Sequence, residues 1–145
     1  MNKLIIFSLI KVGWTTTYCQ DTSVTSDESI RKIIKEGIEA YNNQDWARVK
    51  KGYSENVKVY EFPNTLRNST ADDLISRYPK TFAKYPKNKA EIFDIYIVGN
   101  KAICKERITG RGEPFYTTLI YKFANDKITN IWFISNSPTM QRPKN

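Results

Sequence analysis

Residues 40–46 read AYNNQDW, residues 57–62 read VKVYEF, and residues 120–134 read IYKFANDKITNIWFI. The first stretch closes a helical pattern, the second alternates like a strand, and the third reads as two strands joined by a turn at residues 125–127. N-terminal helices followed by a strongly curved, mixed and mainly antiparallel sheet predict an α+β fold in the shape of a cone. Such a cone has an apolar mouth, so the order of segments predicts a container for a small molecule.

The chain has the length and composition of one domain with a leader. Its 145 residues are 40% hydrophobic, which is enough for one sizeable core. The start combines a basic tripeptide, an apolar run at residues 4–10 and small residues before Gln20, a pattern typical of a signal peptide cut after Cys19. The alternative is an uncleaved N-terminus on a cytosolic protein. We expect a secreted or periplasmic protein with a signal peptide at 1–19, a linker at 20–26, a single folded domain at 27–135 and a polar tail at 136–145.

Several classes of function are disfavoured by composition. The net charge is +8, but the basic residues are scattered and no nucleic-acid-binding motif accompanies them, so no nucleic acid partner is expected. The apolar run is far shorter than a membrane span, so none is expected. The chain has no His and two Cys, which leaves few ligands for a metal. We therefore expect no metal and no cofactor, and we interpret Cys104 as a small core residue.

Apolar residues at helical spacing predict three helices. Thr25 and Glu28 form a capping box before an apolar stripe that runs from Ile30 to Tyr41. Asp45 is placed to cap a second, shorter helix. A third helix is expected from residue 70 onward, with Pro79 kinking or dividing it. A loop is expected between residue 63 and this helix.

A period of two begins near residue 90 and predicts hairpins. Residues 91–98 and 102–109 flank a Gly-Asn turn, which is a strong hairpin signal. In the second of these strands Glu106 shares a face with Ala102 and Ile108 and should point into the core. The following strand should turn its odd-numbered residues inward, from Phe115 to Phe123. The strand at residues 57–62 also alternates. Lys58 prefers solvent, so Glu61 should lie on the opposite, apolar face.

These motifs, in this order, resemble the nuclear transport factor 2-like superfamily, in particular its SnoaL-like and ketosteroid-isomerase-like branch. The resemblance covers residues 27–134 and implies an internal ligand cavity and a homodimer formed through the sheet. By position, Glu61 stands where a ketosteroid isomerase keeps its proton-shuttling carboxylate. Gly37 and Leu119 stand where that family keeps its oxyanion donors, an absence that argues against steroid isomerisation.

Glu61 and Glu106 are the candidate catalytic residues, because carboxylates in an apolar cavity can act as general acids or bases. The alternative is that each is a buried charge paired with a tyrosine hydroxyl or an arginine. Aromatic and apolar side chains of the cone are candidates for ligand contact, although such residues are more often core. These candidates are Tyr41, Trp46, Tyr53, Tyr60, Tyr78, Phe82, Tyr96, Leu119, Tyr121 and Trp132.

Three functions remain open from the sequence. The first is a secreted binding protein whose partner is a small hydrophobic molecule. The second is a cofactor-independent isomerase, cyclase or dehydratase with Glu61 as general base. The third is a dimeric interaction scaffold whose cone is filled by its own side chains, which a cavity smaller than about 300 Å³ would favour.

Overall fold

The computed structural model describes residues 25–134 as four helices and six strands. The predicted signal peptide, most of the predicted linker and the predicted tail lie outside the described residues. The helices are α1 (Asp27–Asn42), α2 (Trp46–Lys51), α3 (Ala71–Ile75) and α4 (Arg77–Lys84). The strands are β1 (Tyr53–Glu61), β2 (Thr65–Asn68), β3 (Lys89–Val98), β4 (Lys101–Thr109), β5 (Phe115–Ala124) and β6 (Lys127–Ile134).

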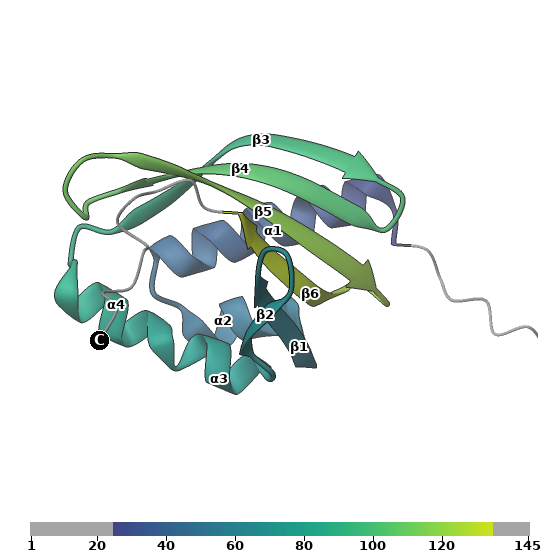
Figure 1. The fold of residues 1–145 in the computed structure, drawn as a ribbon, viewed down its shortest axis with the longest axis horizontal. Coiled ribbons are helices and arrows are strands. Elements are labelled where there is room, and N and C mark those ends of the chain that lie inside the picture. Colours follow the sequence, from purple (N-terminus) through teal and green to yellow (C-terminus); the bar gives the residue numbers. More distant parts are fainter. Residues whose placement is uncertain (1–24, 135–145) are drawn as a thin grey trace, which may run out of the picture.

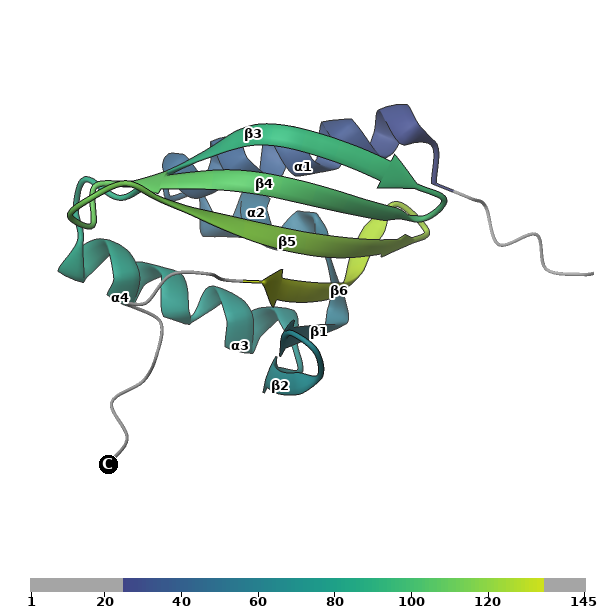
Figure 2. The same cartoon turned by 45° about the horizontal axis from the view of Figure 1, so that its top comes forward.

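The six strands form one curved sheet in the order β2-β1-β6-β5-β4-β3. Strands β1 and β6 pair in parallel, and the other neighbours pair antiparallel. Figure 1 shows β3, β4 and β5 arching over α1, and Figure 2 shows that the helices lie on one side of the sheet. The predicted α+β cone, a mixed and mainly antiparallel sheet behind N-terminal helices, is confirmed.

The inner face of the sheet follows the predicted alternation. In β4 the buried residues are 102, 104, 106 and 108, and in β5 they are 117, 119, 121 and 123. Phe123 is fully buried and packs in one core with Ile30 and Ile34 of α1. Because successive strand residues point to opposite faces, the hairpin register alone places these side chains under the helices. The predicted hairpin between β3 and β4 is confirmed by their pairing from Val98 and Lys101 outward.

The start of α1 differs from the predicted capping box. Ser26 is the N-cap, and its hydroxyl accepts a hydrogen bond from the Ser29 backbone amide at 3.2 Å. Thr25 is buried instead, and its hydroxyl accepts from the backbone amide of Asp126 at 3.3 Å. This contact ties the entry of α1 to the turn between β5 and β6, which a local motif could not reveal. Thr25, assigned to the linker by its sequence, thus packs against the folded domain.

One further difference and one confirmed prediction lie between residues 62 and 84. The expected loop contains the short strand β2, which pairs with the end of β1. The expected third helix is divided into α3 and α4, as predicted, and the division lies at Ser76, three residues before Pro79. Proline is tolerated in the first turn of a helix because its missing amide would have no partner there. None of the helices between residues 25 and 134 is long and apolar enough to cross a membrane.

Candidate functional site

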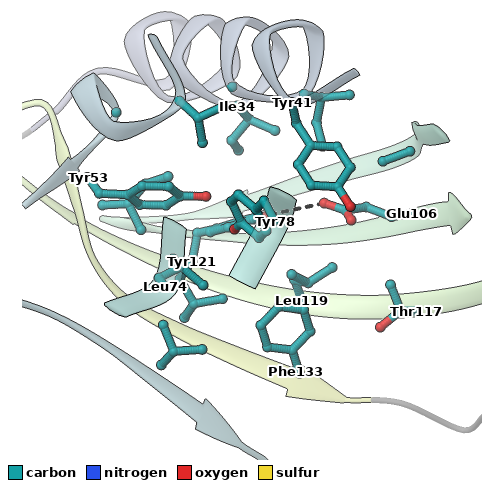
Figure 3. Close-up of a pocket in the computed structure, with 18 of the residues that line it drawn as sticks. Ile34, Tyr41, Tyr53, Leu74, Tyr78, Glu106, Thr117, Leu119, Tyr121 and Phe133 are labelled. Carbon is teal, nitrogen blue, oxygen red and sulfur yellow. Dashed lines mark hydrogen bonds between the residues drawn. The ribbon is translucent and has the colours of Figure 1, made fainter. Parts of the chain in front are cut away.

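A cavity of about 230 Å³ lies between α1, α3, α4 and the inner face of the sheet. Figure 3 shows its lining, in which Ile34, Leu74, Leu119 and Phe133 supply apolar surface around a group of hydroxyl and carboxyl oxygens. Its volume is below the roughly 300 Å³ at which typical ligand pockets begin. The space suits a ligand of one or two rings, and a steroid-sized molecule would require the walls to move.

Gly37 keeps part of this space open. It lies in the middle of α1 and lines the cavity, and a Cβ atom built on it would meet no atom within 4 Å. A glycine inside a helix costs roughly 1 kcal/mol relative to alanine. Gly37 therefore lowers the stability of α1, and the space that its missing side chain leaves open is at the cavity.

Glu106 is the acidic residue that lines the cavity. Its side chain is buried, and the Tyr121 hydroxyl donates a hydrogen bond to its Oε1 atom at 3.0 Å (Figure 3). Burial raises the pKa of Glu106 from 4.5 to about 7, and the hydrogen bond from Tyr121 acts in the opposite direction. A carboxyl group with a pKa near neutrality can both give and take a proton, which is the property of a general acid or base.

Thr117 lies directly across the ladder from Glu106, on β5. It lines the cavity, and its Oγ1 atom is buried without a hydrogen-bond partner among the described residues. A buried hydroxyl without a partner loses its bonds to water, so most such groups are satisfied in proteins. Thr117 and Glu106 therefore present two adjacent polar groups to any occupant of the cavity.

Tyrosine side chains supply further hydroxyl groups to the cavity wall. Tyr53 and Tyr78 line the cavity from β1 and α4, and burial raises the pKa of Tyr53 to about 12 and that of Tyr78 well above its ordinary value. Burial likewise raises the pKa of Tyr121. These phenols stay protonated at neutral pH and act as hydrogen-bond donors or acceptors, not as bases.

Arg111 belongs to the turn between β4 and β5 and reaches the cavity wall. Its Nη2 atom donates to the Tyr41 hydroxyl oxygen at 3.1 Å, and its Nε atom donates to the Asn88 Oδ1 atom. Asn88 is buried, and its Nδ2 atom donates to the same Tyr41 oxygen at 2.8 Å. The three side chains join the turn, the end of α1 and the segment before β3 at one end of the cavity.

Glu61 does not point into the cavity, which corrects the predicted placement. Its carboxylate forms an ion pair with Arg67 at 3.1 Å, and its side chain is 42% exposed. Glu61 is the last residue of β1, and the pairing of β1 with β2 steps from Asn68 to Leu66, so Arg67 is the extra residue of β2 and pairs with the Glu61 carboxylate. Arg67 does line the cavity, so Glu61 touches the wall only through its partner. The alternative of a carboxylate paired with an arginine describes this residue.

The other predicted ligand-contact residues divide into two groups. Tyr41, Tyr53, Tyr78, Leu119 and Tyr121 line the cavity, whereas Trp46, Tyr60, Phe82, Tyr96 and Trp132 do not.

Three structural features keep the five residues of the second group out of the cavity lining. Trp46 and Phe82 pack against the Tyr41 ring, with ring centroids 6.2 and 5.2 Å from it. Tyr60 and Trp132 stack on each other with centroids 5.6 Å apart, and they alternate with inward-facing neighbours on their strands. Tyr96 is 66% exposed. The sequence could identify aromatic residues but not which face of a packed helix or bulged strand meets the hollow.

Three arginines at the cavity were missed by the sequence reasoning. Arg67, Arg77 and Arg111 all line it, and they lie on β2, α4 and a hairpin turn. Arg67 fell in an expected loop, Arg77 on an expected helix and Arg111 in a turn, and charged residues at such positions are mostly solvated, so no local signal singled them out. Thr117 was placed on the inward face by alternation, and only its missing partner gives it importance.

No metal-binding cluster of three His, Cys, Asp or Glu residues occurs within residues 25–134. Cys104 is buried, and burial, followed by the nearby Glu106, raises the pKa of its thiol to about 12. A thiol in such surroundings is a poor nucleophile. The interpretation of Cys104 as a core residue agrees with its burial.

The fold and the cavity define an NTF2-like α+β cone domain. The family model described as the SnoaL-like domain matches residues 34–131, and the chain belongs to this family. No protein with a curated functional description matches the chain significantly.

Solved structures show the same fold. An uncharacterised cystatin-fold protein from Novosphingobium aromaticivorans is 27% identical, with a TM-score of 0.66 over 72% of this chain and 96% of that one. A proposed polyketide cyclase from Sinorhizobium meliloti is 15% identical, with a TM-score of 0.63 over 73% and 98%. A proposed ketosteroid isomerase from Kribbella flavida is 13% identical, with a TM-score of 0.64 over 77% and 82%. The similarity at 15% and 13% identity is one of fold.

Proposed function

We propose that this protein binds a small, largely apolar organic molecule in the cavity under α1. The observation that carries the proposal is an apolar hollow with buried polar groups, Glu106 and Thr117, directed to one place in its wall. Few convergent polar groups in an apolar lining are typical of a ligand site. The open space beside Gly37 supports the same view, because a scaffold with a filled cone gains nothing from a glycine at that position.

The size of the cavity is the observation that favours a scaffold instead. At about 230 Å³ it is small for a ligand pocket. A ligand with two fused rings still fits such a volume, and the unpartnered Thr117 hydroxyl would gain a partner from it. A filled core would leave that hydroxyl without one. The buried polar groups of the wall therefore favour a ligand site over a filled scaffold, despite the small volume.

The binding proposal is tested by calorimetric titration with 2-acetylnaphthalene, a neutral bicyclic ketone. Gly37→Leu places a side chain in the cavity and should lower the affinity at least tenfold. Lys35→Leu adds the same side chain on the exposed face of α1 and should leave the affinity unchanged. Equal affinity in Gly37→Leu and the original protein would refute binding in this cavity. Native mass spectrometry of the purified protein would identify a ligand that co-purifies.

A second candidate function is acid-base catalysis, with Glu106 in the role first assigned to Glu61. The pKa of about 7 and the apolar surroundings favour it. In the simplest step the Glu106 carboxylate takes a proton from the carbon next to a carbonyl group, which leaves an enolate, and then returns a proton to that carbon. In heavy water this step replaces the methyl protons of 2-acetylnaphthalene by deuterium, which proton NMR measures. Exchange that is equally fast with Glu106→Gln would exclude this role.

The outer face of the sheet is the surface on which we propose a homodimer. The helices cover only the inner face (Figure 2), and Phe93, Ile103 and Tyr116 are exposed on strands β3, β4 and β5. Exposed apolar patches of this kind favour association. Light scattering coupled to size exclusion would give twice the chain mass, and Ile103→Lys should return the mass to one chain. A single-chain mass for the unaltered protein at micromolar concentration would reject the dimer.

We also propose export through the N-terminal segment at residues 1–19. The support is its basic start and apolar run. N-terminal sequencing of the protein isolated from its native cell fraction tests this proposal. A chain that begins at Met1 in the cytosol would contradict it.

A further inference from the structure

Arg111 is a positive charge at the cavity wall without a carboxylate partner. The ion pairs found among the described residues involve Arg48, Lys50 and Arg67, and none includes Arg111. The side chain of Arg111 is half-buried, its hydrogen-bond partners Asn88 and Tyr41 are neutral, and its guanidinium lies over the Tyr85 ring, 5.8 Å from the ring centroid. A partly desolvated guanidinium gains from an anion, because neutral hydrogen-bond acceptors compensate its charge only in part.

The hydrogen bonds around Arg111 fix the direction of each donor. A guanidinium can only donate, so the Asn88 side chain must turn its oxygen to Arg111 and its amide nitrogen to Tyr41. The Tyr41 oxygen thus accepts two hydrogen bonds, from Asn88 and from Arg111. Both of its lone pairs are used, so the hydroxyl hydrogen of Tyr41 is left to donate.

No acceptor for the Tyr41 hydroxyl hydrogen is found among the described residues. The hydroxyl group that donates to Glu106 is that of Tyr121. Tyr41 lines the cavity, and Figure 3 shows its ring extending from α1 toward the wall that carries Glu106 and Thr117. The end of the cavity near Arg111 therefore offers an oriented hydroxyl donor beside a fixed cation. Two such donors at one place match the oxygens of a single anionic group.

The charges of the lining favour an anion as well. Arginines 67, 77 and 111 line the cavity, and Glu106 is the acidic residue among the lining side chains. Arg67 is already paired with Glu61, and Arg77 donates to the Arg67 carbonyl oxygen. Arg77 is also without an ion pair among the described residues, but it is exposed and its charge is solvated, so Arg111 is the half-buried lining cation that an anion would match.

We propose that Arg111 and Tyr41 bind the carboxylate of a small aromatic or alicyclic acid whose ring system occupies the apolar part of the cavity. This inference rests on the proposed binding function and names its ligand class. Leu119 and Phe133 supply the apolar wall for the rings. A neutral ketone of the same shape lacks the charge that Arg111 would match and binds more weakly.

The test compares two near-isosteric probes, 2-naphthoate and 2-acetylnaphthalene, by calorimetric titration at pH 6. The expected result is that the unaltered protein binds 2-naphthoate at least tenfold more tightly than the ketone. Arg111→Gln should reduce the affinity for 2-naphthoate at least tenfold and change that for the ketone less than twofold. Tyr41→Phe, which removes only the hydroxyl, should reduce the affinity for 2-naphthoate threefold or more.

Arg48→Gln is the matched control, because Arg48 is exposed, pairs with Glu39 and does not line the cavity. It should bind both probes like the unaltered protein. Equal affinity of the unaltered protein for both probes, or equal losses for both in Arg111→Gln, would overturn the carboxylate site and leave the binding function standing. Binding of neither probe would overturn both. The comparison of probes on the unaltered protein decides the question even where Arg111→Gln fails to fold.

Discussion

Replacing Glu106 with glutamine is expected to make the protein more stable above neutral pH and to change little in acid. In the folded protein, burial raises the pKa of Glu106 from 4.5 to about 7. The folded state therefore holds the proton more tightly than the unfolded chain. The stability associated with the protonated group is fully present below about pH 4.5 and is lost as the pH rises through about 7.

The size of the effect follows from the two pKa values. At about 1.4 kcal/mol per pKa unit, ionised Glu106 lowers the free energy of unfolding by about 3 kcal/mol at pH 8 and by less than about 1 kcal/mol at pH 5. Glutamine resembles the protonated acid, and its amide oxygen can still accept the hydrogen bond from Tyr121. We therefore expect Glu106→Gln to gain up to about 3 kcal/mol at pH 8, or on the order of 10 °C in Tm.

The assay is urea unfolding followed by circular dichroism at pH 5 and pH 8. Glu36→Gln is the matched control, since Glu36 is exposed on α1, has no ion pair among the described residues and loses the same charge. The free energy of unfolding of the control should change little, and by a similar amount at pH 5 and pH 8. A gain in Glu106→Gln that is equal at pH 5 and pH 8, or a loss at pH 8, would refute the reasoning that burial of this carboxyl controls its ionisation.

Three other perturbations test the packing, each by a separate measurement. Phe123→Ala removes a fully buried ring and should lower the free energy of unfolding by about 3–5 kcal/mol in urea titrations; a loss below 1 kcal/mol would contradict its place in the core. Gly110→Ala should cost about 2 kcal/mol or more, because Gly110 has a φ of +79° and a Cβ there would lie 1.8 Å from the Lys87 carbonyl oxygen; an unchanged Tm would show that the turn is held differently. In a Cys19→Ser variant, Cys104 should react with Ellman's reagent at pH 8 only after unfolding, since burial raises its thiol pKa to about 12; fast reaction of the folded protein would show that the site is open.

The hairpins and inner face of the sheet could be predicted because their pattern is local. Strand residues alternate between two faces, so the apolar set in β5 fixes which residues face the helices, and the Gly99-Asn100 turn fixes the register of β3 and β4. Glu106 was placed in the interior by the same rule, and it lies there. Its hydrogen bond from Tyr121 matches the alternative in which a buried carboxyl is satisfied by a tyrosine.

The prediction that Glu61 lines the cavity was wrong because alternation gives the face of a strand but not the partner that the side chain at the end of the strand finds. Glu61 is the last residue of β1, which stays in register with β6 up to the Glu61–Phe133 pair, and Arg67 of the neighbouring strand β2 pairs with its carboxylate. The sequence treated residues 63–69 as a loop and so gave Glu61 no partner. A bulge and a short edge strand depend on the neighbouring strand, which a single segment does not reveal.

By itself, the sequence determined the order of helices and strands, the side of each strand that is buried and the aromatic, apolar character of the interior. Tertiary structure alone decided which polar groups meet inside: Arg111 arrives from a turn, Asn88 from the segment before β3, and Tyr41 from the end of α1. Periodicity is a property of adjacent residues, whereas the size of the cavity and the partners of its charges depend on how distant segments pack. Those distances are set by the curvature of the sheet over the helices.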